Sequence, residues 1–301
     1  MDHRFEPTRY HNSFGSHAPV AQVRDGDRII TTTLDCRGHD AGDHPATDVR
    51  PNPLTGPFYV EGAAPGDVLA VELERIAPSR GTAIAKTMVA DHLLEPETLR
   101  GLPPAEQIIW QLDRERALAW PQEPPRGLER LQVPLAPMLG CLGVAPAGGQ
   151  AISSATSGPH GGNMDWRGTA AGATLYFPVF QEGALLFLGD GHAAQGDGEI
   201  VGQGLETSMD VTLRVRIVRG WEARWPRAET ATHLMTLGNA RPMEEALQHA
   251  TSEMLRWLEA GYGLDASAGS TLLGQCVRYE VGNVYDPAFT MVCALEKRWL
   301  P

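Results

Sequence analysis

Long hydrophobic runs are missing from this 301-residue sequence. No stretch approaches the roughly eighteen consecutive apolar residues that a membrane-spanning helix needs. The first seven residues also lack the apolar stretch of a signal peptide. We therefore expect a soluble, cytoplasmic protein that has no membrane partner.

Concentrated positive charge is also absent. The formal net charge is −12 and the basic residues are scattered, whereas a nucleic-acid-binding protein needs a basic face. Only two of the 25 basic residues are lysines, Lys86 and Lys297. We expect no nucleic-acid partner, and Schiff-base chemistry has few candidate residues.

Cysteine is scarce, and no two cysteines form a C-x-x-C pair. For a cytosolic chain, the spacing argues against both a zinc ribbon and a disulfide framework. We expect all four to behave as small buried hydrophobic residues: Cys36, Cys141, Cys276 and Cys293.

Several catalytic motifs are absent as well. There is no G-x-S-x-G nucleophile elbow, no H-E-x-x-H, no P-loop and no dinucleotide-binding G-x-G-x-x-G between a strand and a helix. The serine-rich run 153–157 is compatible with a Ser-cis-Ser-Lys amidase, but that mechanism requires a lysine and both lysines lie in unrelated contexts. The apolar neighbours of Cys141 favour burial over catalysis.

Short apolar segments separated by turns dominate what is present. With 33 glycines and 23 prolines, turns are frequent, and alternation of apolar and polar residues is typical of half-buried strands. No fixed-period repeat is present, which excludes solenoids and propellers. We predict strands at 28–34, 58–60, 68–76, 173–180, 184–188, 211–218 and 290–295.

Helical spacing is confined to a few segments. Apolar residues three to four apart follow Pro242 until Gly261, and Asp265 is placed to cap a second helix that reaches about residue 277. We also predict a helix over 104–120, ended by the prolines that follow. The predicted fold is mostly β, with β-sandwich or barrel-like sheets and an α+β C-terminal portion. The predicted division is 1–130 and 131–301, or a single intertwined domain.

Residues able to bind metal gather in three glycine-rich segments, 34–40, 157–165 and 189–199. Glycine lets the backbone turn tightly and approach a ligand, and imidazole with carboxylate suits a divalent metal. Each segment alone could be a structural turn. The third, however, holds Asp, His, Gln, Asp and Glu within eleven residues, which is more ionisable side chain than a turn needs. We therefore expect a functional site there.

These segments resemble the acetamidase/formamidase family, which hydrolyses small aliphatic amides to the acid and ammonia. The resemblance extends in the expected order over most of the chain, while the region from about 80 to 130 departs from the family pattern. The matching segments are 52–57 (NPLTGP), 60–69 (VEGAAPGDVL), 143–146 (GVAP), 160–165 (HGGNMD), 189–199 (GDGHAAQGDGE) and 286–287 (DP).

The resemblance implies a β-rich, divalent-metal-dependent hydrolase of a small amide that assembles as a homo-oligomer. Zinc is the first expectation for the metal, and carboxylate-rich ligands also admit calcium or manganese. We assign Glu199 as the acid/base catalyst and Asn163 and Gln195 as substrate-binding residues. The assigned metal ligands are Asp35, His160, Asp165, Asp190 and His192.

Two other functions remain open at this stage. The same site could hydrolyse a different or cyclic amide C–N bond. Alternatively, the chain could be a non-catalytic β-sandwich binding protein with a structural metal, since structural sites are closed by protein ligands. Glu199 and Gln195 are not assigned as ligands but stand beside them in the sequence, and this favours the enzyme.

Overall fold

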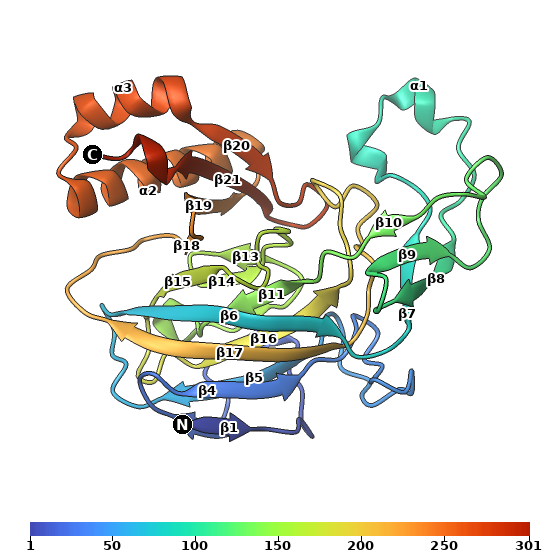
Figure 1. The fold of residues 1–301 in the computed structure, drawn as a ribbon, viewed down its shortest axis with the longest axis horizontal. Coiled ribbons are helices and arrows are strands. Elements are labelled where there is room, and N and C mark those ends of the chain that lie inside the picture. The colour runs from blue at the N-terminus through green and yellow to red at the C-terminus, as the bar shows by residue number, and fades with distance from the viewer.

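Two large β-sheets carry most of the chain in the computed structural model, which describes residues 1–301 (Figure 1). Neighbouring strands pair antiparallel except for two parallel pairs at sheet edges. The nine-stranded sheet has the order β1 (Asp2–Arg4), β4 (Arg28–Thr32), β17 (Met209–Val218), β6 (Val68–Pro78), β15 (Thr174–Pro178), β18 (Arg227–Glu229), β19 (His233–Ala240), β21 (Phe289–Glu296) and β20 (Arg278–Val281). The six-stranded sheet has the order β13 (Ser157–Gly158), β14 (Gly161–Asn163), β11 (Met138–Gly143), β16 (Leu186–His192), β5 (Leu54–Val60) and β3 (Ala21–Val23).

The smaller elements complete the fold. They are a four-stranded sheet, a two-stranded sheet, three helices, and three short 3-10 turns at Asp91–Leu93, Ala147–Gly149 and Lys297–Trp299. The four strands are β10 (Val133–Pro134), β9 (Leu118–Pro121), β8 (Gln107–Asp113) and β7 (Thr82–Lys86), and the two are β12 (Ile152–Ser153) and β2 (Ser13–Phe14). The helices are α1 (Pro96–Leu99), α2 (Met243–Tyr262) and α3 (Ala266–Cys276).

The main core lies between the two large sheets. Figure 1 shows β6 and β17 running across β16 and β11, and a single cluster of 30 buried hydrophobic residues joins their facing sides. Leu69 and Leu213 from one sheet and Leu142 and Leu186 from the other belong to it, each fully buried. This is the packing of a β-sandwich, and it confirms the predicted mainly β fold. Strands from both sides of residue 130 take part in each large sheet.

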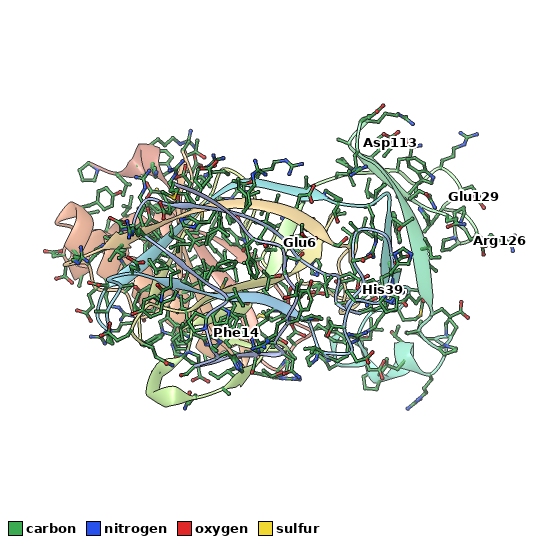
Figure 2. The ribbon with its side chains drawn as sticks, turned by 90° about the horizontal axis from the view of Figure 1, so that it is seen from below. Glu6, Phe14, His39, Asp113, Arg126 and Glu129 are labelled. Carbon is green, nitrogen blue, oxygen red and sulfur yellow. The ribbon has the colours of Figure 1, made fainter.

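The predicted helix over 104–120 is wrong, because that segment forms β8 and β9. Ile108, Trp110 and Leu112 turn toward the protein while Ile109 between them is 49% exposed, so the apolar residues follow the two-residue period of a strand. The four-stranded sheet projects from the sandwich, with Asp113 and Arg126 near its outer rim (Figure 2).

The C-terminal portion packs its helices on its own sheet. Buried Met254 and Leu258 of α2 join a cluster with Leu234 of β19 and Leu295 of β21, so the apolar face of α2 is covered within the chain. No helix in the structure combines the length and apolar character that a bilayer crossing requires.

The ends of these helices follow the expected signals with one shift. The carboxylate of Asp265 accepts a hydrogen bond from the Ala268 amide at 2.8 Å and caps α3 as predicted. Gly261 does not end α2; the chain leaves the helix at Gly263, which has a φ of 67°. The helix therefore ends where the left-handed backbone conformation is required.

The cysteines are all free thiols. Cys141 and Cys293 are buried as expected, whereas Cys36 and Cys276 are half-buried.

Candidate active site

Strand β16 carries the predicted Asp190 and His192 into the protein interior. All seven of its residues are buried, because neighbouring strands flank it in the sheet and the core covers it. Beside it on β11, Gly140 leaves the space that two carboxylates occupy. A Cβ at this glycine would lie 2.2 Å from Asp165 Oδ1 and 2.7 Å from Asp190 Oδ2. The absence of a side chain at Gly140 thus lets the two aspartates approach each other.

Six titratable side chains form one cluster at this place, which we call the acidic cluster. Three overlapping triplets, each with ligand atoms within 4.8 Å of one another, connect its members: Asp165, Asp190, His192, Glu199, Glu206 and Asp286. Asp165 and His192 are fully buried, while Glu199 is 7% exposed and Asp286 is half-buried. The cluster is therefore closed on the inside and opens at Glu199 and Asp286.

Negative charge is in excess within the cluster, which holds five carboxyl groups and one imidazole. No lysine or arginine forms an ion pair with any of the five. Burial raises the pKa of Asp165 and Glu199 well above the usual range, and raises those of Glu206 to about 7 and Asp286 to about 6. Protons or a cation must balance this charge.

A hydrogen-bond chain fixes the orientation of His192. The Gln195 side-chain nitrogen donates to the Asp165 and Gly282 carbonyl oxygens at 2.5 and 3.2 Å, so its oxygen faces His192 Nδ1 at 2.8 Å. Nδ1 then carries a proton and Nε2 points toward Glu206 Oε1 at 3.0 Å. Burial favours neutral His192, but the charges of Glu206 and Asp190 outweigh it and raise the pKa of this imidazole.

Three buried carboxylate oxygens at the cluster centre have no hydrogen-bond partner, namely both oxygens of Asp165 and Glu206 Oε2, while His192 Nε2 faces only Glu206 and Asp190 carboxylates. Buried polar atoms are normally satisfied, and each exception calls for a specific explanation. Carboxylate oxygens and a neutral imidazole nitrogen are donors that divalent metals accept. The cluster could therefore hold a divalent cation.

Backbone strain is concentrated around the same place. Of the eight residues other than glycine with a positive φ, four surround the cluster: Asn52 (36°), Asp165 (41°), Asp190 (54°) and Glu199 (48°). The left-handed conformation is unfavourable for residues with a Cβ and persists where the surrounding structure enforces it, often at functional sites.

Asn163 links the cluster rim to a neighbouring asparagine. Its side-chain nitrogen donates to Asp286 at 2.6 Å, and its oxygen accepts from Asn52 Nδ2 at 3.2 Å. Asn52 Nδ2 also lies 3.1 Å from Asp190 Oδ2, and the Cys141 thiol donates to Asn163 Oδ1 at 2.8 Å. The side chains of Asn163 and Gln195 are thus both engaged with other protein groups.

Two predicted ligands lie outside the acidic cluster. Asp35 forms an ion pair with buried Arg80 at 2.6 Å and accepts the Arg37 and His39 backbone amides, both at 2.9 Å. His160 is buried with both ring nitrogens unpartnered, and burial lowers its pKa to about 4. The structure brings neither together with the other predicted ligands.

Three residues of the site were missed by the sequence analysis. Asn52 and Asp286 stand in segments quoted for the family resemblance, so a signal for them was present. Glu206 has no such signal, because it lies in the connection between β16 and β17 but outside the three glycine-rich segments. Its backbone forms bridges with both His192 and Ile84, which only the folded structure reveals.

Known proteins resemble the chain over its whole length. The crystal structure of an acetamidase from Yersinia enterocolitica superposes with a TM-score of 0.87 and 32% identity, covering 100% of this chain and 93% of that one. A γ-lactamase from Delftia acidovorans shares the fold at a TM-score of 0.61 and 19% identity, covering 97% and 90% of the two chains.

Curated relatives are longer than this chain. A formamidase of Methylophilus methylotrophus is 26% identical over 69% of this chain, and an acetamidase of Mycolicibacterium smegmatis is 27% identical over 70%. The matches cover 64% and 66% of those relatives, so the chain spans about two thirds of their length. The model of the Acetamidase/Formamidase family matches residues 2–150 and 148–246. The expected resemblance is confirmed, and this chain belongs to the Acetamidase/Formamidase family.

Proposed function

We propose that this protein hydrolyses small linear amides to a carboxylate and ammonia, with a divalent cation bound in the acidic cluster. The observation that carries the proposal is the set of unpartnered buried carboxylate oxygens on Asp165 and Glu206, beside the imidazole of His192. Membership of a family whose relatives are named formamidase and acetamidase supports the substrate class.

We assign the cation to Asp165, Asp190, His192 and Glu206, a revised set from which Asp35 and His160 are omitted. A bound divalent cation would polarise the amide carbonyl and make nearby water more acidic. Three carboxylates and one imidazole suit zinc, and calcium or manganese are alternatives. Gln195 holds the imidazole of His192 in the tautomer that presents Nε2 to the cluster.

Glu199 is the proposed acid/base residue because it lies at the opening of the cluster. Its carboxylate accepts a proton as the water oxygen bonds to the amide carbon, and returns that proton to nitrogen as the C–N bond breaks. Ammonia leaves and the carboxylate product remains. Burial raises the pKa of Glu199, so its carboxylate accepts a proton more readily than an exposed carboxylate does.

Asn163 and Gln195, predicted as substrate-binding residues, receive positioning roles in this proposal. Asn163 orients Asp286 through the 2.6 Å hydrogen bond, and Gln195 orients His192. Assembly as a homo-oligomer and a cytoplasmic location are also proposals.

The decisive experiment measures ammonia release from formamide, acetamide and propionamide by fresh protein and by chelator-stripped protein with single metals added back. We expect activity to fall on stripping and to return with one ion. Activity that survives complete stripping would contradict the metal assignment. Protein that binds the metal but releases no ammonia from any of the three would instead favour another amide or a binding protein.

Glu199→Gln tests the catalytic assignment within the same assay. We expect turnover to fall by about 10²–10⁴-fold while metal content remains, because general acid–base catalysis contributes that much. Near wild-type turnover in metal-loaded Glu199→Gln would show that Glu199 is not the acid/base residue.

A further inference from the structure

A pocket of about 770 Å³, which we call the basic pocket, is lined in part by residues that stand next to members of the acidic cluster in the sequence. Its lining includes Lys86, His92, Arg241 and Tyr285. Formamide and acetamide contain only a few non-hydrogen atoms, whereas a pocket of this size accommodates a much larger molecule. The simple amides would therefore leave most of this space unused.

Three chain segments connect the basic pocket to the acidic cluster. Val201 and Tyr285 line the pocket, and they stand two residues from Glu199 and one residue from Asp286. The Ala90 amide donates to the Ile200 carbonyl at 2.8 Å and fixes the first of these segments.

Strand β7 makes the third connection. Ile84 is bridged to Glu206 of the cluster, and Lys86 follows two residues later on the same strand, roughly 7 Å away along it. His92 Nε2 lies 2.7 Å from the Val284 carbonyl, which ties the segment around α1 to the loop between β20 and β21 (Figure 1). The pocket and the cluster are therefore neighbours.

The charge of the pocket is opposite to that of the protein as a whole. Lys86 and Arg241 line it, Asp91 is its one carboxylate, and the chain carries a net charge of −12. Neither cation forms an ion pair. Lys86 Nζ contacts the Tyr285 hydroxyl at 3.3 Å, and the Arg241 guanidinium stacks 4.8 Å from the centre of the Phe289 ring. Both cations are thus held in place without a negatively charged partner.

From this arrangement we infer that the preferred substrate is a primary amide whose acyl group ends in a carboxylate, the half-amide of a dicarboxylic acid. The amide would react at the acidic cluster while Lys86 and Arg241 bind the distant carboxylate. Because ammonia is the leaving group, the charged substituent must be on the acyl side. The inference rests on the proposed amidase function and specifies its substrate class.

The test compares kcat/KM within pairs of amides. Malonamate, succinamate and glutaramate place one, two or three methylene groups between the amide and the carboxylate. Levulinamide is the neutral counterpart of succinamate, with a methyl ketone in place of the carboxylate. We expect kcat/KM for the best half-amide to exceed kcat/KM for its neutral counterpart by about tenfold or more, which is the contribution of a charge-assisted hydrogen bond.

Variants assign that preference to the basic pocket. We expect Lys86→Met and Arg241→Met each to reduce the ratio of kcat/KM for succinamate over levulinamide by about tenfold. Arg100→Met is the matched control, because Arg100 is exposed beside α1 and does not line the pocket. The control should retain the wild-type ratio, and Arg241→Met remains informative if Lys86→Met does not fold.

Equal kcat/KM values for half-amides and neutral amides would overturn the inference while leaving the amidase function standing. A ratio that both variants leave unchanged would overturn it as well. Absence of ammonia release from every amide would overturn the proposed function itself, and the substrate inference with it.

Discussion

The protein contains two groups of aspartate and histidine side chains that look alike in the sequence but differ in the structure. One comprises Asp35, His39 and Asp43, and the other is the acidic cluster around Asp165. In the first, Arg37 and Arg80 form ion pairs with both aspartates, at distances from 2.6 to 3.6 Å. In the second, no arginine or lysine takes part.

The difference shows how a structural group is distinguished from a binding site. A buried carboxylate paired with a cation and backbone amides has its charge balanced within the chain. The acidic cluster holds five carboxyl groups and leaves oxygens of Asp165 and Glu206 unpartnered. Its charge is not balanced within the chain, so the compensating charge must come from outside. The presence of arginine, rather than the number of acidic residues, separates the two groups.

The largest effect expected from this contrast is on activity. Asp165→Asn should lower kcat/KM by about three orders of magnitude and reduce metal content, because a cation that polarises the substrate contributes several kcal/mol. Ammonia release and elemental analysis measure the two quantities. Asp197→Asn is the control, since Asp197 lies in the same glycine-rich segment but is exposed and paired with Arg167. Full activity and metal content in Asp165→Asn would remove the distinction between the groups.

Substitutions in the group around Asp35 should instead act mainly on the stability of the folded protein. Asp35→Asn leaves Arg80, 6% exposed, without its carboxylate, and we expect the free energy of unfolding to fall by about 3–5 kcal/mol. Denaturant unfolding measures this change. Asp43→Asn removes an exposed partner of the same arginines and should cost about 1 kcal/mol or less. Unchanged stability but lost metal in Asp35→Asn would return Asp35 to the set of ligands.

A smaller effect concerns pH. The raised pKa values of Glu206, about 7, and Asp286, about 6, mean that the folded chain binds protons more tightly than the unfolded chain. Their contribution to stability is thus present at low pH and lost as pH rises through these values. Metal-stripped protein should become less stable between about pH 4 and pH 7, the interval between the ordinary and the raised pKa values, by at most about 1.4 kcal/mol per pH unit for each proton released.

Metal-loaded protein supplies the comparison for that experiment. Deprotonated ligands bind a cation more tightly, so its melting temperature should fall less over the same pH range, or rise. Thermal unfolding of both forms at several pH values provides the measurement. Identical pH profiles for stripped and loaded protein would show that the acidic cluster does not hold the cation.

The sequence predicted the part of the site that is local along the chain. Asp165, Asp190, His192 and Glu199 stand in glycine-rich segments, where closely spaced acids and histidine indicate a site. Burial beside the core and the antiparallel pairing of β11 with both β14 and β16 then bring Asp165 close to Asp190 and His192. Local spacing was therefore sufficient to select four residues that the fold brings together, while their roles stay a prediction.

Interactions between distant residues decided what the sequence analysis missed. Asp35 is neutralised by Arg80, 45 residues away, and nothing near Asp35 in the chain shows that pairing. Glu206 joins the site through the strand connection that follows β16. The strands β8 and β9 were predicted as a helix ended by prolines, and pairing with the distant strands β7 and β10 selects the strand.

The left-handed backbone at Asp165, Asp190 and Glu199 has a consequence for laboratory evolution. Glycine adopts this conformation without strain, so replacing any of the three by glycine removes both backbone strain and a buried negative charge. A selection that rewards heat resistance alone would draw these positions toward glycine and lose the chemistry. Directed evolution of a more thermostable variant therefore needs to screen for ammonia release in every round.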